Sequence, residues 1–289
     1  MKHGVQVTIL LAVLFLCAQL VGLAVISEYI DVPASVAAGK AVWEDLPSVG
    51  GVKVERPDVE PSVSIWFILG AVVVGTLLIL LIIRLQTILL WKLWFFFAVA
   101  LCLQIALAAF LPSSVSLALA AFLGFFKVFR PNVYVHNFTE LFVYAGLAAI
   151  FVPILNVLYA FVLLLALSLY DMYAVWKSKH MIAMAKFQAQ SGIFAGLFVP
   201  YKRPSLMKGR SVRKESVRTA VLGGGDIGFP MIFSGTVLAS SGFGSAVVVS
   251  LGATFALVLL LLLGQKDRFY PAMPFLTAGC SIGFLFTLL

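Results

Sequence analysis

Residues 245–264 read SAVVVSLGATFALVLLLLLG, a run of 20 residues without a charged side chain. A helix needs about 20 apolar residues to cross the hydrocarbon core of a bilayer, so this stretch predicts a transmembrane helix. The apolar runs do not alternate with polar residues as barrel strands do, and helices therefore satisfy the backbone in lipid most economically. Eight further apolar segments complete an all-α polytopic membrane protein with nine predicted transmembrane helices, at 5–26, 63–83, 93–111, 113–126, 133–153, 155–176, 219–241 and 272–289.

The overall composition agrees with a chain that lies mostly in lipid. Hydrophobic residues make up 62% of the 289 positions and charged residues 11%, and the mean hydropathy is +1.10. Soluble globular domains carry roughly 25% charged residues, so the composition excludes a soluble enzyme, a disordered chain and a nucleic-acid-binding domain. Cys17, Cys102 and Cys280 lie inside apolar runs and are interpreted as small buried side chains, not as a disulfide framework or a metal site.

The distribution of basic residues predicts the orientation. With the N-terminus in the cytoplasm, alternating spans place 17 of the 20 Lys and Arg residues on the cytoplasmic side, ten of them in the inner loop 177–218. The outer loop 27–62 holds the other three, together with seven acidic residues. By the positive-inside rule the N-terminus is cytoplasmic and the C-terminus extracytoplasmic. The formal charge of +8 is thus mostly an orientation signal toward anionic lipid, and no nucleic-acid partner is expected.

The loops divide the chain into parts of one predicted membrane domain. Residues 1–176 hold the first six helices and the outer loop, residues 177–218 form a basic cytoplasmic loop, and residues 219–289 hold the last three helices. The first apolar run, 5–26, exceeds the usual 7–15 apolar residues of a signal peptide, so we expect a retained anchor helix. Apolar positions around 178–198 predict an interfacial helix.

Three acidic residues, Glu140, Asp171 and Asp226, lie within apolar runs. An ionisable side chain in a span is costly, and each is therefore a functional candidate. Asp171 lies six residues before Lys177, roughly 9 Å inside the cytoplasmic boundary, and Asp226 lies eight residues after Arg218, roughly 12 Å inside it. Neighbouring antiparallel helices could bring the two aspartates face to face, and Glu140 could reach the same level.

Two facing carboxylates have more than one use. Close like charges in a low dielectric share one proton, so that one group is an acid and the other a base. Such a pair can activate water against a peptide bond, as in aspartic proteases. The same pair could relay protons in a transporter, or the two aspartates could be unrelated buried residues with backbone or hydroxyl partners. The predicted depth of the two aspartates in the membrane does not by itself favour the protease, the proton relay or the structural interpretation.

Local sequence context adds two features. Gly223, Gly224 and Gly225 precede Asp226 and let water or a substrate backbone approach the acid, although small residues also serve close helix packing. Pro271-Ala272-Met273-Pro274 opens the last segment on the cytoplasmic side. Its prolines leave carbonyls without intrahelical donors, which could dock an extended peptide, although proline is also ordinary in a first helical turn.

These residues resemble the motifs of a known family. Tyr170-Asp171 is similar to its YD motif, Gly223-Gly224-Gly225-Asp226 to its GxGD motif, and Pro271-Ala272-Met273 to its PAL motif with Met in place of Leu. The order of the motifs, the span numbers and the long loop between the aspartates resemble the presenilin and signal peptide peptidase family of intramembrane aspartyl proteases. The cytoplasmic loop and compact length are most similar to an archaeal presenilin homologue.

The resemblance implies an intramembrane aspartic endopeptidase that cleaves transmembrane helices of single-span proteins or signal-peptide remnants. It implies a multi-pass protein of the cell membrane. It implies no cofactor, no metal and no obligatory partner subunit, and a homo-oligomer is compatible with it. Asp171 and Asp226 would be the catalytic dyad. The residues that would shape the substrate-binding site are Tyr170, Gly223, Gly224, Gly225, Pro271, Ala272, Met273 and Pro274.

Other membrane functions fit the sequence less well or stay as alternatives. His3, His136 and His180 are scattered and lack the HExxH spacing of a zinc protease. A proton-coupled transporter or channel that uses Asp171 and Asp226 as relay groups is the main alternative. A non-catalytic chaperone for membrane helices is a third class.

Overall fold

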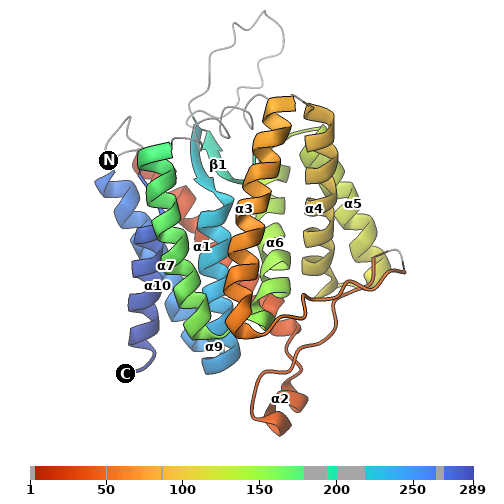
Figure 1. Cartoon of the computed structure of the whole chain (residues 1–289), viewed down its shortest axis with the longest axis vertical. Helices are drawn as coiled ribbons and strands as arrows, with labels where there is room; N and C mark the ends of the chain where they lie inside the picture. Colours follow the sequence, from red (N-terminus) through yellow and green to blue (C-terminus); the bar gives the residue numbers. More distant parts are fainter. Residues whose placement is uncertain (1–3, 50, 86, 179–193, 201–218, 265–269) are drawn as a thin grey trace, which may run out of the picture.

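The computed structural model describes residues 4–49, 51–85, 87–178, 194–200, 219–264 and 270–289. The elements form a bundle of helices with a small sheet at one end (Figure 1). The long helices are α1 (Val5–Glu28), α3 (Pro61–Leu85), α4 (Ile88–Ala108), α5 (Ser113–Phe129), α6 (Val133–Phe151), α7 (Val157–Tyr173), α9 (Gly224–Leu263) and α10 (Met273–Phe286). The smaller elements are α2 (Val32–Ala38), a 3-10 turn (Val152–Ile154), a π-helical turn (Ala174–Ser178), β1 (Gly196–Pro200) and β2 (Thr219–Gly223).

Six of the described helices are long and apolar enough to cross a membrane: α1, α3, α4, α6 with its 3-10 turn, α7 with its π-helical turn, and α9. The helices α5 and α10 are apolar but shorter. A mostly helical membrane protein is therefore confirmed, whereas the count of nine crossings stays a prediction. Asparagines begin two of the helices, because Asn132 accepts a hydrogen bond from the N–H of Tyr134 and Asn156 accepts one from Tyr159.

The helix α9 contains two of the predicted segments, 219–241 and 245–264, and it folds back on itself. Gly242 interrupts it with a φ of 86°, a left-handed conformation that favours glycine. The hydroxyl of Ser250 donates to the hydroxyl of Ser234 at 3.2 Å. Since residues 16 apart in a straight helix are separated by about 24 Å, the two halves of α9 pack against each other as a hairpin.

The prediction of a helix from residue 219 is wrong for its first five residues. Residues 219–223 form β2, which pairs antiparallel with β1, with Gly196 opposite Gly223 and Phe198 opposite Val221. The predicted interfacial helix around 178–198 is wrong where it overlaps β1, and residues 179–193 lie outside the described residues. The chain thus enters α9 from a strand, which places Asp226 in the first helical turn.

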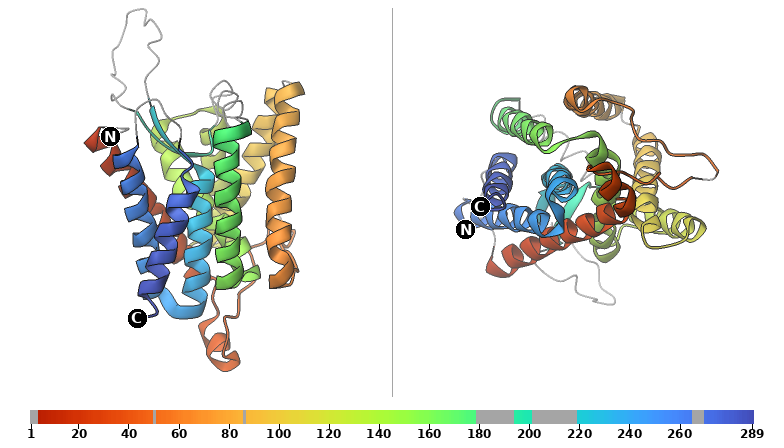
Figure 2. Two further views of the ribbon diagram at one scale, coloured as in Figure 1. Left: turned by 60° about the vertical axis from the view of Figure 1, so that its left-hand side comes forward. Right: turned by 90° about the horizontal axis from the view of Figure 1, so that it is seen from below.

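The main core lies among α1, α6, α7, α9 and α10, and a smaller core joins α4 to α5. Glycines allow the closest approaches, because a side chain on Gly252 or Gly279 would overlap the carbonyl oxygen of the other where α9 meets α10. The helix α3 lies at the outside of the bundle, and few of its residues are buried (Figure 2). Its apolar surface suits contact with lipid.

Candidate active site

Asp171 and Asp226 meet at the end of the bundle that carries the sheet. Asp171 lies in the last turn of α7, and Asp226 lies in the first turn of α9. Both side chains are partly buried, and their carboxylates are near enough to interact electrostatically. The two helices come from opposite sides of the loop 177–218 in the sequence and lie against each other in the fold.

Each carboxylate is held by backbone N–H groups. The N–H of Met273 donates to Oδ2 of Asp171 at 3.1 Å, and the N–H of Ala272 is a second donor toward the same carboxylate. Asp226 occupies the third position of α9 and reaches back to the N–H of Gly223, which is the N-cap residue. This is the acidic half of a capping box, in which a side chain in the first turn satisfies a backbone donor that the helix leaves free.

The segment Pro271–Pro274 joins the site through the start of α10. Met273 is buried, Ala272 is the N-cap residue, and Pro274 lies in the first turn. One turn further, the hydroxyls of Thr277 and Ser168 lie 2.8 Å apart and fasten α10 to α7. This polar contact fixes the position of Asp171, which follows Ser168 on α7 by less than one turn.

The three glycines before Asp226 have different surroundings. The N–H of Gly224 donates to the carbonyl of Ala195 at 3.1 Å, which ties the start of α9 to the residue before β1. A side chain on Gly224 would overlap the hydroxyl of Tyr144 on α6, whereas a Cβ on Gly225 would meet Phe229 at an ordinary 3.5 Å. Gly225 is exposed. Tyr170, the other motif residue, is partly buried beside Asp171 on α7.

The sheet next to the site was not predicted from the sequence. Val221 and Leu222 form a short apolar run before the glycines, and residues 196–200 are a similar run that ends in Pro200. Such five-residue runs could have been assigned to strands, because they are too short for a helix of their own. The continuous apolar character of 219–241 instead favoured one helix.

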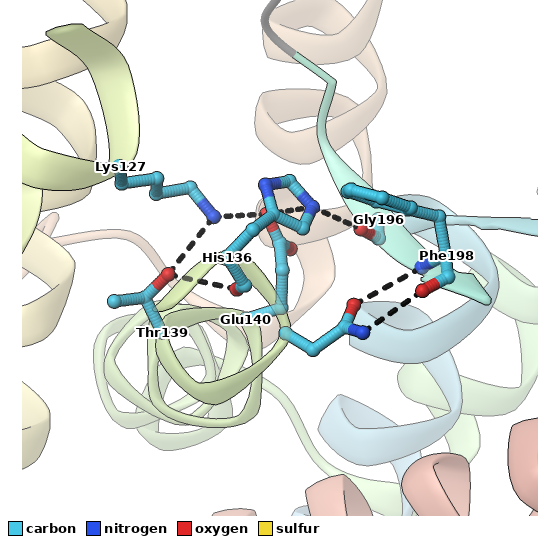
Figure 3. Close-up of polar contacts among 7 residues, drawn as sticks. Lys127, His136, Thr139, Glu140, Gly196 and Phe198 are labelled. Carbon is cyan, nitrogen blue, oxygen red and sulfur yellow. Dashed lines mark hydrogen bonds and ion pairs between the residues drawn. The ribbon is translucent and has the colours of Figure 1, made fainter. Parts of the chain in front are cut away.

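Glu140, the third candidate acid, has a different partner. Its Oε1 accepts a hydrogen bond from Nζ of Lys127 on α5, and both side chains are 1% exposed (Figure 3). His136 lies one turn before Glu140, with its Nε2 3.7 Å from the same oxygen. Lys127 is one of the 17 basic residues that the sequence assigns to the cytoplasmic side, and its ammonium group is buried between α5 and α6. Its side of the membrane stays a prediction. Glu140 belongs to this cluster and not to the pair of aspartates.

Among the described residues, no group of three or more His, Cys, Asp and Glu side chains has a metal-binding arrangement. The groups that can perform chemistry at the meeting point of α7, α9 and α10 are two carboxylates with backbone donors around them. Such a pair can hold one proton between them and act as acid and base on a water molecule.

Comparisons with a family sequence model and with solved structures give consistent results. The sequence model of a family described as signal-peptide peptidase, presenilin aspartyl protease matches residues 50–289. Two solved structures, each described as a presenilin family intramembrane aspartate protease, share the fold. One, in space group C222, has a TM-score of 0.64 with 20% identity over 97% of this chain and 98% of its own. The other, in space group P2, has a TM-score of 0.63 with 19% identity over 96% of each chain. No curated protein sequence matches the chain.

Proposed function

We propose that this chain, which belongs to the signal-peptide peptidase and presenilin aspartyl protease family, cleaves transmembrane helices through a dyad of Asp171 and Asp226. The family match confirms the resemblance noted in the motifs. The chain is thus an intramembrane aspartic endopeptidase and a multi-pass integral membrane protein. Three points are our proposal: that Asp171 and Asp226 form the catalytic dyad, that the substrates are transmembrane helices, and that the protein lies in the cell membrane.

The observation that carries the dyad is the placement of Asp171 in the last turn of α7 and of Asp226 in the first turn of α9, two helices that pack against each other and against α10. One ionised carboxylate takes a proton from water, and the resulting hydroxide attacks the carbonyl carbon of the peptide bond. The other, protonated carboxyl gives its proton to the carbonyl oxygen, so that a gem-diol forms. Proton transfer to the nitrogen then lets the C–N bond break. The N–H groups of Met273 and Ala272 support the ionised form of Asp171.

The edge of β2 offers a place for the substrate backbone. Asn137 on α6 binds both the N–H and the carbonyl of Phe198, at 3.1 and 2.8 Å, on the outer side of β1. Val221 lies opposite Phe198, so its own backbone groups point away from β1. Its side chain is 48% exposed. An unwound segment of a substrate helix that pairs with Val221 by strand addition would run past Gly223 toward Asp226.

The proposed orientation has the N-terminus and the sheet on the cytoplasmic side. The N-terminal end of α1 and the sheet lie at one end of the bundle, and α2 and the C-terminus lie at the other (Figure 1). An odd number of crossings gives this arrangement, which supports the proposed nine. We further propose that residues 1–176, 177–218 and 219–289 form one membrane domain. This domain acts without an obligatory partner subunit, whether it is a monomer or a homo-oligomer.

The proposed function is tested with the purified full chain in liposomes. A fluorescent single-span peptide is added, and mass spectrometry locates any cut. We expect cleavage inside the hydrophobic segment and its inhibition by a peptide mimic that carries a hydroxyl in place of the scissile carbonyl. The same liposomes are loaded with a pH-sensitive dye. Proton flux without cleavage would contradict the protease and support a transporter that uses the same aspartates.

A further inference from the structure

A buried polar cluster on α5 and α6 takes no part in the chemistry described above. Lys127, His136, Thr139 and Glu140 gather around one carboxylate (Figure 3). Nζ of Lys127 donates to Glu140 and, at 3.2 Å, to the hydroxyl of Thr139. That hydroxyl donates in turn to the carbonyl of His136 at 2.8 Å. The cluster is thus a connected network within the apolar bundle.

The buried ion pair in this network joins α5 to α6 at a large cost in desolvation free energy. Removing two charges from water costs several kcal/mol per ion, and apolar side chains of similar size commonly stabilise such a contact as well or better. Ionisable residues inside a membrane domain are functional candidates for the same reason. Stability of the α5–α6 contact alone therefore does not account for Lys127 and Glu140.

The network reaches the sheet through His136 and its neighbour. Nε2 of His136 lies 2.7 Å from the carbonyl oxygen of Gly196, and since a carbonyl only accepts, Nε2 carries the proton and donates it. The ring of Phe198 packs on the imidazole with its centroid 4.7 Å away. Asn137 adds the two hydrogen bonds to the backbone of Phe198. All three bonds hold the outer edge of β1 against α6.

From β1 the connection to the dyad is short. Gly196 pairs with Gly223, and the N–H of Gly224 donates to Ala195, so the position of β1 sets the start of α9. Asp226 lies in the first turn of that helix and binds the N–H of Gly223. Tyr144, one turn beyond Glu140 on α6, is within electrostatic reach of both Glu140 and Asp226.

We propose that His136 and Asn137 are positioning residues, held in place by the Lys127–Glu140 ion pair, which fix β1 to α6 and thereby set the position of Asp226 for the reaction. The proposal rests on the proposed function for its catalytic consequence. Its structural part, a sheet held by α6, stands on the hydrogen bonds alone and is measured separately.

The experiment compares His136→Phe with His136→Gln in the full chain in detergent. Phenylalanine keeps a ring but has no donor, whereas the amide of glutamine places an N–H near the position of Nε2. Hydrogen exchange followed by mass spectrometry reports on residues 194–200 and 219–226. We expect exchange about tenfold faster there in His136→Phe, the scale of one or two lost hydrogen bonds, and exchange close to the wild type in His136→Gln. Asn137→Leu should behave like His136→Phe.

Cleavage kinetics give the second readout. In His136→Phe and Asn137→Leu we expect kcat to fall about tenfold with KM nearly unchanged, and in His136→Gln we expect recovery of most of kcat. Tyr134→Phe is the matched control, because Tyr134 lies exposed on the same helix. Unchanged exchange or unchanged kcat in His136→Phe would overturn the proposal, and so would an equal loss in His136→Gln.

The ion pair has its own test. Lys127→Met leaves the Glu140 carboxylate buried without its cation, so we expect faster exchange in β1 and β2 in this variant. The double variant Lys127→Met with Glu140→Gln removes both charges and should restore part of the protection. If the wild type cleaves no peptide, the proposed function fails, while the exchange data still decide whether α6 holds the sheet.

Discussion

The backbone N–H of Met273 donates a hydrogen bond of 3.1 Å to Oδ2 of Asp171, which lies 102 residues earlier in the chain. This bond joins the start of α10 to the end of α7 and explains why a proline-rich segment near the C-terminus belongs to the site. The donor is the backbone, so the side chain of Met273 contributes by packing. It is buried, at 4% exposure.

Met273→Leu should therefore leave the enzyme nearly unchanged. The swap conserves volume and the backbone donor, and we expect a loss of less than about 1.5 kcal/mol in the free energy of unfolding. Met273→Ala leaves a cavity, and we expect a loss of about 2–5 kcal/mol together with lower activity. Unfolding in mixed micelles and peptide cleavage measure the two effects. Equal stability of the two variants would show that the side chain is not packed as described.

Gly224 and Gly225 should respond differently to alanine. In Gly224→Ala the new methyl group overlaps the Tyr144 hydroxyl, and overpacking of this kind costs about 1–3 kcal/mol. In Gly225→Ala the methyl group makes an ordinary contact with Phe229, so we expect an unchanged Tm. Thermal unfolding in detergent compares them. A lower Tm for Gly225→Ala than for Gly224→Ala would contradict the geometry of this turn.

The contact between α9 and α10 should depend on Gly279. Its substitution by alanine places a methyl group on the carbonyl of Gly252, and we expect a destabilisation of about 1–3 kcal/mol. Gly244→Ala is the matched control on α9, because nothing lies within 4 Å of its Cβ position. The control should keep or slightly raise Tm through its higher helix propensity. Equal Tm values for the two variants would argue against this helix contact.

Tyr29, just beyond α1, gives a pH-dependent prediction. Burial raises the pKa of Tyr29 from 10.0 to about 12, and its hydroxyl donates to the carbonyl of Ile105 at 2.7 Å. The neutral form favours the folded state, so its contribution is complete below pH 10 and is lost as pH rises toward 12. The unfolded state loses the phenolic proton at a lower pH than the folded state, and the stability of the protein therefore falls over this range. We expect the difference in stability between the wild type and Tyr29→Phe to shrink over this range. A constant difference would contradict the shift.

The sequence predicts most of the bundle, because a long apolar run is strongly penalised in water. It also singles out the two aspartates, because an acidic side chain within such a run is costly. Asp171 and the start of α10 could be located in this way. The helix hairpin in α9 contains the two predicted segments 219–241 and 245–264, which the break at Gly242 separates. The number of crossings and the orientation stay predictions.

The sheet and the ion pair could not be predicted, for different reasons. Residues 219–223 are as apolar as the helix that follows, so periodicity does not separate strand from helix in so short a run. The sequence pattern assigns each residue a separate role, Lys127 as one of the basic residues that set the orientation and Glu140 as a candidate acid. They lie on two helices joined by the short connection 130–132, and a buried charge of each sign on such neighbours is the signal that indicates a pair.

The central claim is that the carboxylates of Asp171 and Asp226 work as one unit. The most direct measurement is the dissociation constant of the hydroxyl-bearing peptide mimic for the wild type, Asp171→Asn, Asp226→Asn and the double variant, with Asp58→Asn as the control in the exposed outer loop. We predict that each single change weakens binding by about 100-fold and that the double variant binds no more weakly than either one. Full affinity in either single variant, or losses that multiply in the double variant, would contradict a shared site.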